Sequence, residues 1–265
     1  MTATLAAIAV ERGLLDWTTA AAAVLDVDGS MEITLERLLA HAAGIRPLTD
    51  DSEFLGLPPE RSGVARLLVS EHPLFEPGTD NAYSNGGYAV AAAMLEEVTG
   101  ATWEGLLQAW LAEPLSIELG IGWPAGLAGH YERDGELVTH DQADGYRVHT
   151  AIAPAGDVSA TIGAYGRFVQ LHLRGLRGRP ELIASESFER LHTPLRGVFA
   201  LGWGVQPWEG ARTSVHAGSA GTFFSVVAVQ PEQDLAVAVV TNAGGHRAET
   251  ASAGLARELI GMHAA

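Results

Sequence analysis

The sequence contains no lysine, so all 16 of its basic side chains are arginines. Cysteine is also absent, which excludes disulfides, thiolate metal sites and a cysteine nucleophile from this chain. Bases are scarce relative to acids, because 32 Asp and Glu residues give a formal net charge of -16. A surface of this charge disfavours nucleic acid or an anionic membrane as a partner.

The start of the chain lacks a basic segment, and its first apolar run ends at Glu11 and Arg12. This pattern indicates neither a signal peptide nor a membrane span, and we expect a cytoplasmic protein. The length of 265 residues and an apolar content of 47% predict a globular chain with a large core. We expect one domain over 1–265, with a helical lobe over about 14–195, a sheet and terminal helix over about 196–265, and the helix 2–12 packed between them.

Helical periodicity dominates the first two thirds of the sequence. Apolar spacings of three and four residues, with Gly or Pro as terminators, predict helices over 2–12, 20–25, 34–42, 64–69, 85–99, 103–111, 159–173 and 185–192. His41 lies beside the apolar stripe of the third of these segments, and we interpret it as a packed histidine rather than a ligand.

The last third changes character. Segments rich in β-branched and aromatic residues, separated by turns, predict antiparallel strands over 199–206, 213–216, 222–230 and 235–241. The last two strands are apolar on both faces, so both faces of the sheet should be covered. The terminal helix is one expected cover, packed through Ala248, Ser252, Leu255, Leu259 and Met262. The fold class is therefore α+β, with a helical lobe before an antiparallel sheet.

Two polar side chains stand out in the loop Phe75 to Tyr88, namely Tyr83 and Asn85. A phenol two residues before an amide, at the start of an apolar helix, is one way to aim an acid/base hydroxyl and a hydrogen-bonding amide at a ligand. The structural alternative is a turn tyrosine beside an Asn helix cap. The tripeptide by itself favours that alternative.

Periodicity is lost between Gly120 and Gly156, where Gly, Pro, His and Asp accumulate. The pattern predicts a long irregular connection, of the kind that often borders a binding site. Five polar residues of this region could in principle bind a metal, namely His130, His140, Asp141, Asp144 and His149. No tight ligand pair such as His-x-x-x-His occurs among them, and we expect no metal and no cofactor.

Seven landmarks, in order, resemble the serine β-lactamase and D-alanyl-D-alanine carboxypeptidase superfamily, in particular its class C β-lactamase and esterase-like branch. They are the segments 33–41, 75–78 with 83–88, 113–115, 153–156, 201–204, 216–219 and 241–243. The likeness covers nearly the whole chain, and its ordered spacing is more specific than any one motif. It implies a β-lactamase/transpeptidase-like fold whose N-terminal strands are absent from this sequence.

The resemblance also implies roles for individual residues. In the family, the serine of Ser-x-x-Lys attacks a carbonyl, while the lysine and the tyrosine of Tyr-x-Asn handle its proton. Tyr83 would be that acid/base phenol, and Asn85 a contact to a substrate amide or carboxylate. His216-Ala217-Gly218 stands where the family carries Lys-Thr-Gly or His-x-Gly, and Ser219 would give one oxyanion-hole N–H.

The main departure is that Ser-x-x-Lys is missing, and without any lysine a displaced copy is excluded from these residues. Ser84 and Ser219 are the candidate substitute nucleophiles, but neither lies in a Gly-x-Ser-x-Gly elbow. Three functions follow: a serine hydrolase of impaired activity toward a lactam, peptide or ester, a pseudoenzyme that binds an acyl or peptide-like ligand, or a subunit completed by another chain.

A structural consequence also follows from the resemblance. In the family, two N-terminal strands pair alongside the last strand, which is 235–241 here. An apolar strand left open at a sheet edge is a template for pairing. We therefore expect a homo-oligomer or a complementing segment to cover the edge of strand 235–241.

Overall fold

The computed structural model describes residues 1–124, 126–140, 148–219 and 221–264. The chain forms two compact units and passes between them several times. The first unit comprises 1–114, 148–157 and 190–202, and the second comprises 115–147, 158–189 and 203–265. Segments 115–147 and 158–189 thus group with the sheet, whereas the sequence analysis placed them in the helical lobe of about 14–195. The single-domain organisation of 1–265 stays a prediction.

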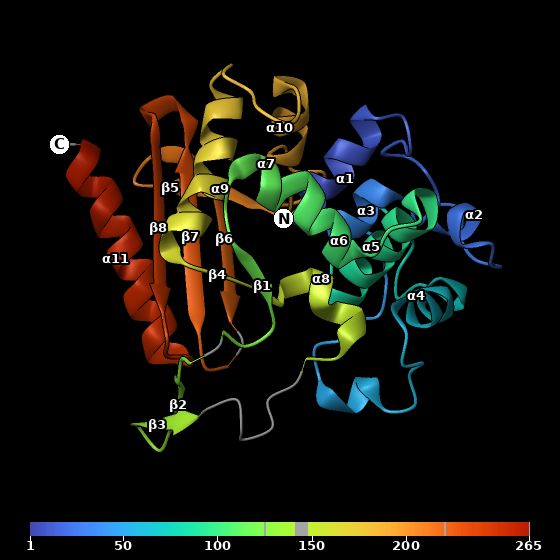
Figure 1. The fold of residues 1–265 in the computed structure, drawn as a ribbon, viewed down its shortest axis with the longest axis horizontal. Helices are drawn as coiled ribbons and strands as arrows, with labels where there is room; N and C mark the ends of the chain where they lie inside the picture. Colours follow the sequence, from blue (N-terminus) through green and yellow to red (C-terminus); the bar gives the residue numbers. More distant parts are fainter. Residues whose placement is uncertain (125, 141–147, 220, 265) are drawn as a thin grey trace. The chain divides into compact units, whose positions relative to one another are not determined.

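The first unit is helical, and Figure 1 shows its helices in blue and green, apart from α8, which is yellow. Its longest helix, α5 (Asn85–Thr99), is rich in alanine and contacts most of the others, because small side chains allow close approach. Gly100 ends α5 in the left-handed conformation, as predicted. The other helices are α1 (Thr2–Glu11), α2 (Ala21–Leu25), α3 (Leu35–Leu39), α4 (Arg61–Ser70), α6 (Trp103–Leu107) and α8 (Ala153–Gly156).

Shorter turns complete the helical part of the chain. A π-helical turn over Gln108–Ala112 and the short helix α7 (Glu113–Leu115) continue α6, so the predicted helix over 103–111 is divided in two and the helical path runs on beyond its predicted end. Two 3₁₀ turns cover Asp51–Phe54 and Thr150–Ile152. Among the described residues, no helix combines the length and the apolar character needed to cross a membrane.

Helix α3 ends earlier than the sequence predicts. Its last turn closes with hydrogen bonds from the His41 N–H to the Leu38 carbonyl and from the Ala42 N–H to the Arg37 carbonyl. These two bonds form a Schellman motif, in which the residue after the C-cap is left-handed. That residue is His41, with φ of 56°. The apolar spacing continued to Ala42, but the backbone had already turned.

The second unit is built on a four-stranded antiparallel sheet in the order β5-β6-β7-β8. In the β7–β8 ladder, Val226 pairs with Val239 and Ala228 with Val237. The sequence placed the last strand correctly, but the first begins at 204 rather than 199 and the second extends to Ser219. The strands are β5 (Gly204–Trp208), β6 (Ala211–Ser219), β7 (Phe224–Gln230) and β8 (Leu235–Thr241).

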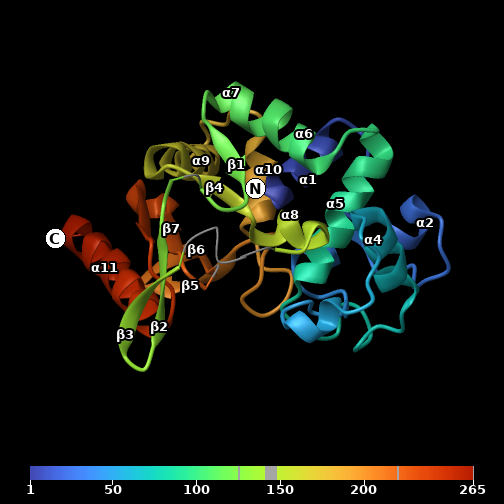
Figure 2. The ribbon, with the colours of Figure 1, turned by 60° about the horizontal axis from the view of Figure 1, so that its bottom comes forward.

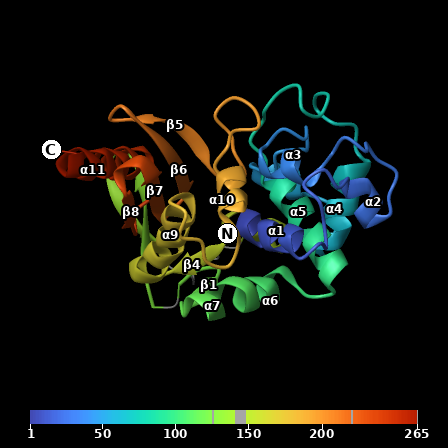
Figure 3. The same ribbon diagram turned by 90° about the horizontal axis from the view of Figure 1, so that it is seen from above.

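Helices cover both faces of this sheet, as the apolar character of β7 and β8 predicts. Seen from above in Figure 3, α9 (Ile162–Leu176) and α11 (His246–Ala264) lie on opposite sides of β7 and β8. Tyr165 of α9 hydrogen-bonds the Ser225 side chain of β7, and burial raises the pKa of this tyrosine to about 12. On the other face, Ala256 and Ile260 of α11 join a core cluster that includes Phe224 and Val239. The remaining helix, α10 (Ser185–Leu191), follows α9.

The predicted packing face of α11 is wrong in part. The buried side chains are Ser252, Ala256 and Ile260, whereas Leu255, Leu259 and Met262 are exposed by 46%, 40% and 70%. Small side chains at 252 and 256 let the helix approach the sheet closely. Its rotation is also fixed from one side, because Arg257 lies over the Trp208 ring, 4.2 Å from the centroid.

The region predicted to be irregular, Gly120 to Gly156, contains a hairpin of β2 (Gly129–Arg133) and β3 (Glu136–His140), drawn in light green in Figure 2. At its borders β1 (Leu119–Ile121) pairs with β4 (Val158–Ala160), so the helix predicted from residue 159 begins later, at Ile162. The hairpin is joined to the ends of β7 and β8, where the His130 N–H donates to the Asn242 carbonyl at 2.8 Å. Its strands were missed because each is short and carries several polar residues.

The two edges of the main sheet differ. β5 carries Pro207, which cannot donate to a further strand, and such residues protect natural edges. β8 has the sequence LAVAVVT, without charge or proline, and Val240 on it is 47% exposed. Within the described residues, β8 pairs only with β7 in this sheet. The β8 edge is therefore open and apolar.

Candidate functional site

Tyr83 and Asn85 lie together in the first unit. The Tyr83 hydroxyl donates a hydrogen bond of 3.0 Å to Asn85 Oδ1. The amide nitrogen of Asn85 donates to the Leu48 carbonyl at 3.0 Å, which fixes the amide so that its oxygen faces the phenol. Tyr83 itself is 54% exposed. The phenol is thus oriented by its neighbour while remaining accessible from solvent.

Backbone carbonyls of residues 46–48 anchor this loop. The Arg46 carbonyl accepts from the Ser84 hydroxyl at 2.9 Å, and the Pro47 carbonyl accepts from the Asn85 N–H at 2.8 Å. Gly86 permits this approach, because a Cβ there would lie 2.5 Å from the Arg46 carbonyl oxygen. The start of α5 is consequently held against the backbone of residues 46–48.

Ser84, and not Asn85, caps helix α5. Its hydroxyl accepts from the Gly87 N–H at 2.9 Å and donates its proton to the Arg46 carbonyl. The side chain is buried, with 3% exposure. A hydroxyl whose proton is directed at a carbonyl, away from any base, is a helix cap. These contacts count against Ser84 as a substitute nucleophile.

His41 was predicted to be a packed histidine, and the structure confirms this. Its ring is 8% exposed and lies 4.6 Å from the Tyr83 ring, 5.4 Å from Tyr88 and 5.3 Å from Phe199, centroid to centroid. Nδ1 of His41 accepts a hydrogen bond of 3.1 Å from the Ser84 N–H. The His41 side chain is therefore both packed and in contact with the Tyr-x-Asn loop, and the sequence did not predict this second contact.

The protonation of the two tyrosines follows from the desolvation of their hydroxyl groups. Desolvation raises the pKa of Tyr83 above its ordinary value. Burial, with a smaller contribution from Tyr83, raises the pKa of Tyr88 further, and the Tyr88 hydroxyl donates to the Leu39 carbonyl at 2.9 Å. Tyr83 is therefore a phenol, not a phenolate, near neutral pH. It is ready to donate a proton, whereas removing one from a nucleophile requires a cation that lowers its pKa.

The other predicted site residues lie in the second unit, at the end of β6. His216 is exposed and its ring centroid lies 6.3 Å from that of Trp203. Gly218 and Ser219 are also exposed and pair with Ser225 and Phe224 of β7. The Ser219 hydroxyl accepts from the Gly221 N–H at 3.2 Å, a contact within the turn after β6. The structure brings Tyr83 and Asn85 together in one unit and groups His216, Gly218 and Ser219 in the other.

Three of the five candidate metal ligands lie among the described residues, and each of them contacts other groups. His149 Nδ1 accepts from the Ala151 N–H at 3.2 Å, and His130 Nδ1 lies 3.0 Å from the Asn242 carbonyl. The His140 ring packs near Trp123 and Tyr131. Asp141 and Asp144 lie outside the described residues. Within the described part of the chain, no group of three or more His, Asp or Glu side chains is arranged to hold a metal ion.

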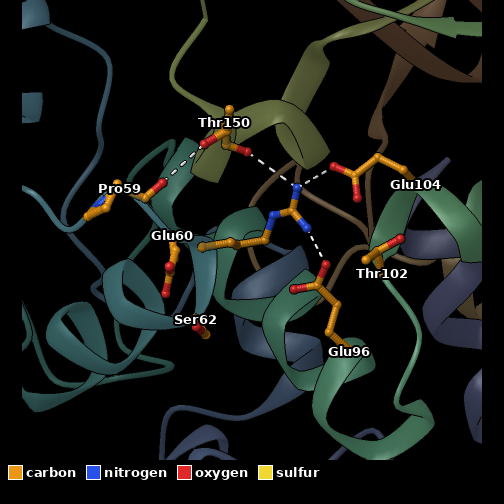
Figure 4. Close-up of a pocket in the computed structure, with 8 residues that line it drawn as sticks. Pro59, Glu60, Ser62, Glu96, Thr102, Glu104 and Thr150 are labelled. Carbon is orange, nitrogen blue, oxygen red and sulfur yellow. Dashed lines mark hydrogen bonds and ion pairs between the residues drawn. The ribbon is translucent and has the colours of Figure 1, made fainter.

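A polar cavity of about 400 Å³ also lies in the first unit (Figure 4). Arg61, with 9% of its side chain exposed, is one of the lining residues and is ion-paired to Glu96 and, at 2.6 Å, to Glu104. Glu96 in turn accepts from the Trp103 N–H at 2.8 Å. The network joins α4, α5 and α6. Its charges are committed to one another, so we interpret it as structural.

Comparison with known proteins agrees with this fold. A solved class C beta lactamase from Rhodobacter sphaeroides superposes with a TM-score of 0.78 at 19% identity, covering 98% of this chain and 82% of that one. The octameric penicillin-binding protein homologue from Pyrococcus abyssi gives 0.77 at 20% identity, covering 92% and 60%. The architecture is thus that of the β-lactamase/transpeptidase fold, with mixed helices and antiparallel sheet.

Sequence comparison extends the likeness to a family. The model of the Beta-lactamase family matches residues 1–260, and the chain belongs to that family. Penicillin-binding protein 4 of Amycolatopsis lactamdurans is 26% identical in an alignment of 260 residues that covers 90% of this chain and 66% of that protein. This chain therefore spans less than two thirds of that relative's length. The predicted superfamily and fold class are confirmed.

Proposed function

We propose that this chain binds an acyl ligand (a lactam, peptide or ester) through Tyr83 and Asn85, and that it does not form an acyl-enzyme by itself. One observation carries the proposal: the phenol and amide are held 3.0 Å apart on an anchored loop, while the sequence offers no lysine to activate a nucleophile. Ester or amide hydrolysis is the activity of the parent serine hydrolases. In this proposal the ligand-orienting groups, Tyr83 and Asn85, are retained while the hydrolytic activity is lost.

Each residue has a distinct role in this proposal. Tyr83, protonated near neutral pH, donates a hydrogen bond to the ligand in place of Asn85. Asn85 contacts a ligand amide or carboxylate. In the second unit, His216 supplies an imidazole where relatives use a fixed cation, and the Ser219 N–H is a donor for a carbonyl oxygen. The exposure of His216, Gly218 and Ser219 supports accessibility to a ligand.

Covalent labelling and reversible binding test the two parts separately. Treated with a fluorescent penicillin and with a fluorophosphonate, the 265-residue chain is expected to remain unlabelled. Reversible penicillin binding, followed by NMR, should weaken about fivefold to tenfold in Tyr83→Phe and in Asn85→Ala, the effect of losing one hydrogen bond. Tyr131→Phe in the β2–β3 hairpin is the matched control and should bind as the unmodified chain does.

Other outcomes identify the alternatives. Covalent labelling of the chain alone, mapped to Ser84 or Ser219, contradicts the pseudoenzyme proposal and restores the hydrolase. Labelling that appears only when a second polypeptide containing Ser-x-x-Lys is added supports a subunit completed by another chain. Equal penicillin affinity in all three variants removes Tyr83 and Asn85 from the binding site.

We also propose that a second copy of the chain covers the β8 edge. Arg257 lies over Trp208 of β5, so this side of α11 is directed toward β5. The exposed side chains of Leu255, Leu259 and Met262 lie on the opposite side of the helix. That apolar side is therefore directed away from β5, past the open edge of β8. α11 contacts both β7 and β8. If two β8 strands paired antiparallel, about 4.8 Å apart, their α11 axes would lie about 10 Å apart, which is a normal helix packing distance.

Light scattering after size exclusion tests this arrangement. The unmodified chain is expected to be a dimer, while Val240→Lys and Leu259→Glu should yield monomers because each places a charge in the paired surface. Leu137→Glu on β3, where the leucine is already 59% exposed, should leave the dimer intact. A monodisperse monomer, or a distinct polypeptide that co-purifies on β8, excludes the second copy.

A further inference from the structure

We infer that His41 is the positioning residue of the Tyr83 phenol: its side chain, rather than its backbone, holds the Tyr83-Ser84 segment in the orientation that presents the hydroxyl beside Asn85. The inference deepens the proposed function and rests on it for the meaning of the phenol. Its evidence lies entirely in the contacts of the first unit.

The loop is attached to His41 at two points. The Ala82 N–H donates to the backbone carbonyl of His41 at 2.9 Å, and the Ser84 N–H donates to its ring Nδ1 at 3.1 Å. These attachments bracket Tyr83 on both sides. Because Nδ1 accepts, it carries no proton, and the proton of the neutral imidazole is on Nε2. The histidine therefore serves here as an acceptor.

The same imidazole supports the tyrosine ring. The two ring centroids are 4.6 Å apart and their planes are inclined by 39°. Tyr88 and Phe199 lie against the imidazole at 5.4 Å and 5.3 Å, so it is held by rings outside the Tyr83-Ser84 segment. A rotation of the imidazole that removed Nδ1 from Ser84 would also displace the surface on which Tyr83 rests. Hydrogen bond and ring contact thus act on the same two residues.

The backbone conformation of His41 indicates that the side chain has its own purpose. The left-handed position after a helix C-cap is usually glycine, which adopts it without steric cost. A residue with a Cβ in this conformation costs about 1 kcal/mol. The backbone conformation at position 41 favours glycine. The presence of histidine there therefore indicates that the imidazole has a role of its own.

This conformation also provides a clean variant. His41→Gly keeps the left-handed turn and the backbone carbonyl but removes both Nδ1 and the ring. His41→Asn also tolerates the left-handed conformation and retains a side-chain acceptor, without the ring. The pair separates the hydrogen bond from the ring contact, and neither variant imposes new strain on α3.

Amide hydrogen exchange by NMR of the ligand-free chain tests the inference. In His41→Gly, exchange at the Ser84 N–H should accelerate about fivefold to tenfold, as expected for the loss of one hydrogen bond. Exchange at the Ala82 N–H should be unchanged, because its acceptor is a backbone carbonyl. His41→Asn should restore part of the protection at Ser84. Free imidazole, added to His41→Gly, should restore it as well.

The Tyr83 phenol gives the second measurement. With five tyrosines in the chain, ring-labelled tyrosine and a Tyr83→Phe reference assign its signal. Its pKa should fall toward the ordinary value in His41→Gly, because the ring loses its buried support, and imidazole should reverse the change. Neither readout depends on penicillin, so failure to bind an acyl ligand refutes the proposed function without affecting this result.

Two results overturn the inference. If His41→Gly lowers the unfolding midpoint while Ser84 exchange and the Tyr83 titration stay unchanged, the histidine has only a packing role. If Ser84 and Ala82 lose protection equally, the backbone turn holds the loop and the imidazole does not.

Discussion

Arg61→Ala should lower the free energy of unfolding by about 3 kcal/mol, because it leaves carboxylates that are partly withdrawn from water without their counter-ion. Only 22% of the Glu96 side chain is exposed, and Glu96 also receives the Trp103 N–H. Loss of Arg61 therefore weakens the junction of α4, α5 and α6 at several points. Chemical denaturation followed by circular dichroism measures the change directly.

Arg66 provides the matched control on the same helix. It too pairs with a glutamate of α5, Glu97, but at 3.4 Å and with 42% of the arginine and 49% of the glutamate side chain exposed. Exposed pairs of this kind contribute about 0–1 kcal/mol. Arg66→Ala should therefore be nearly silent. If the two alanine variants were equally stable, the buried network would not have the structural role that its geometry indicates.

Gly175→Ala should cost about 3 kcal/mol, at the upper end of the range for overpacking a core. A Cβ at position 175 would lie 2.0 Å from Cδ2 of Phe188, whose ring is fully buried against α9. The gain in helix propensity, about 1 kcal/mol, is too small to offset this clash. Thermal and chemical denaturation of the purified variant give the measurement.

Two further variants identify the clash as the cause. Gly166 lies in the same helix with no atom within 4 Å of a built Cβ, so Gly166→Ala should stabilise the chain by up to about 1 kcal/mol. Combining Gly175→Ala with Phe188→Leu should recover part of the loss, because the smaller side chain leaves room for the methyl group. A destabilised Gly166→Ala would show instead that α9 tolerates no added methyl.

Much of the fold could be predicted because periodicity and punctuation agree over long segments. β8 was predicted to the residue, and α5 with its glycine terminator was placed correctly. The errors arose where close packing or backbone geometry overrides pattern. In α11, Ser252 and Ala256 are buried in place of Leu255 and Leu259, because small residues allow the closer approach to the sheet. The β2–β3 hairpin lacks the apolar alternation that reveals a strand.

For the site, the sequence led to Tyr83 and Asn85, and the structure shows the hydrogen bond between them. It did not reveal His41 as their neighbour. A histidine beside an apolar helical stripe is ordinarily a core residue, and nothing local signals that α3 stops at Leu39 and turns the imidazole toward Ser84, 43 residues later. That contact is long-range, and a local pattern cannot encode it. The roles of His216, Gly218 and Ser219 stay predictions.

The anchoring of the Tyr83 loop has a consequence for how this sequence can vary. The partners that residues 46–48 offer to Ser84, Asn85 and Gly86 are all main-chain carbonyls. The side chains of Arg46 and Pro47 can therefore be exchanged without removing an acceptor, provided the backbone path is kept, whereas the Leu48 side chain is fully buried in the core. Substitution at positions 46 and 47 is thereby uncoupled from the geometry of the phenol and the amide. These two positions can change side chain while Tyr83 and Asn85 remain in place.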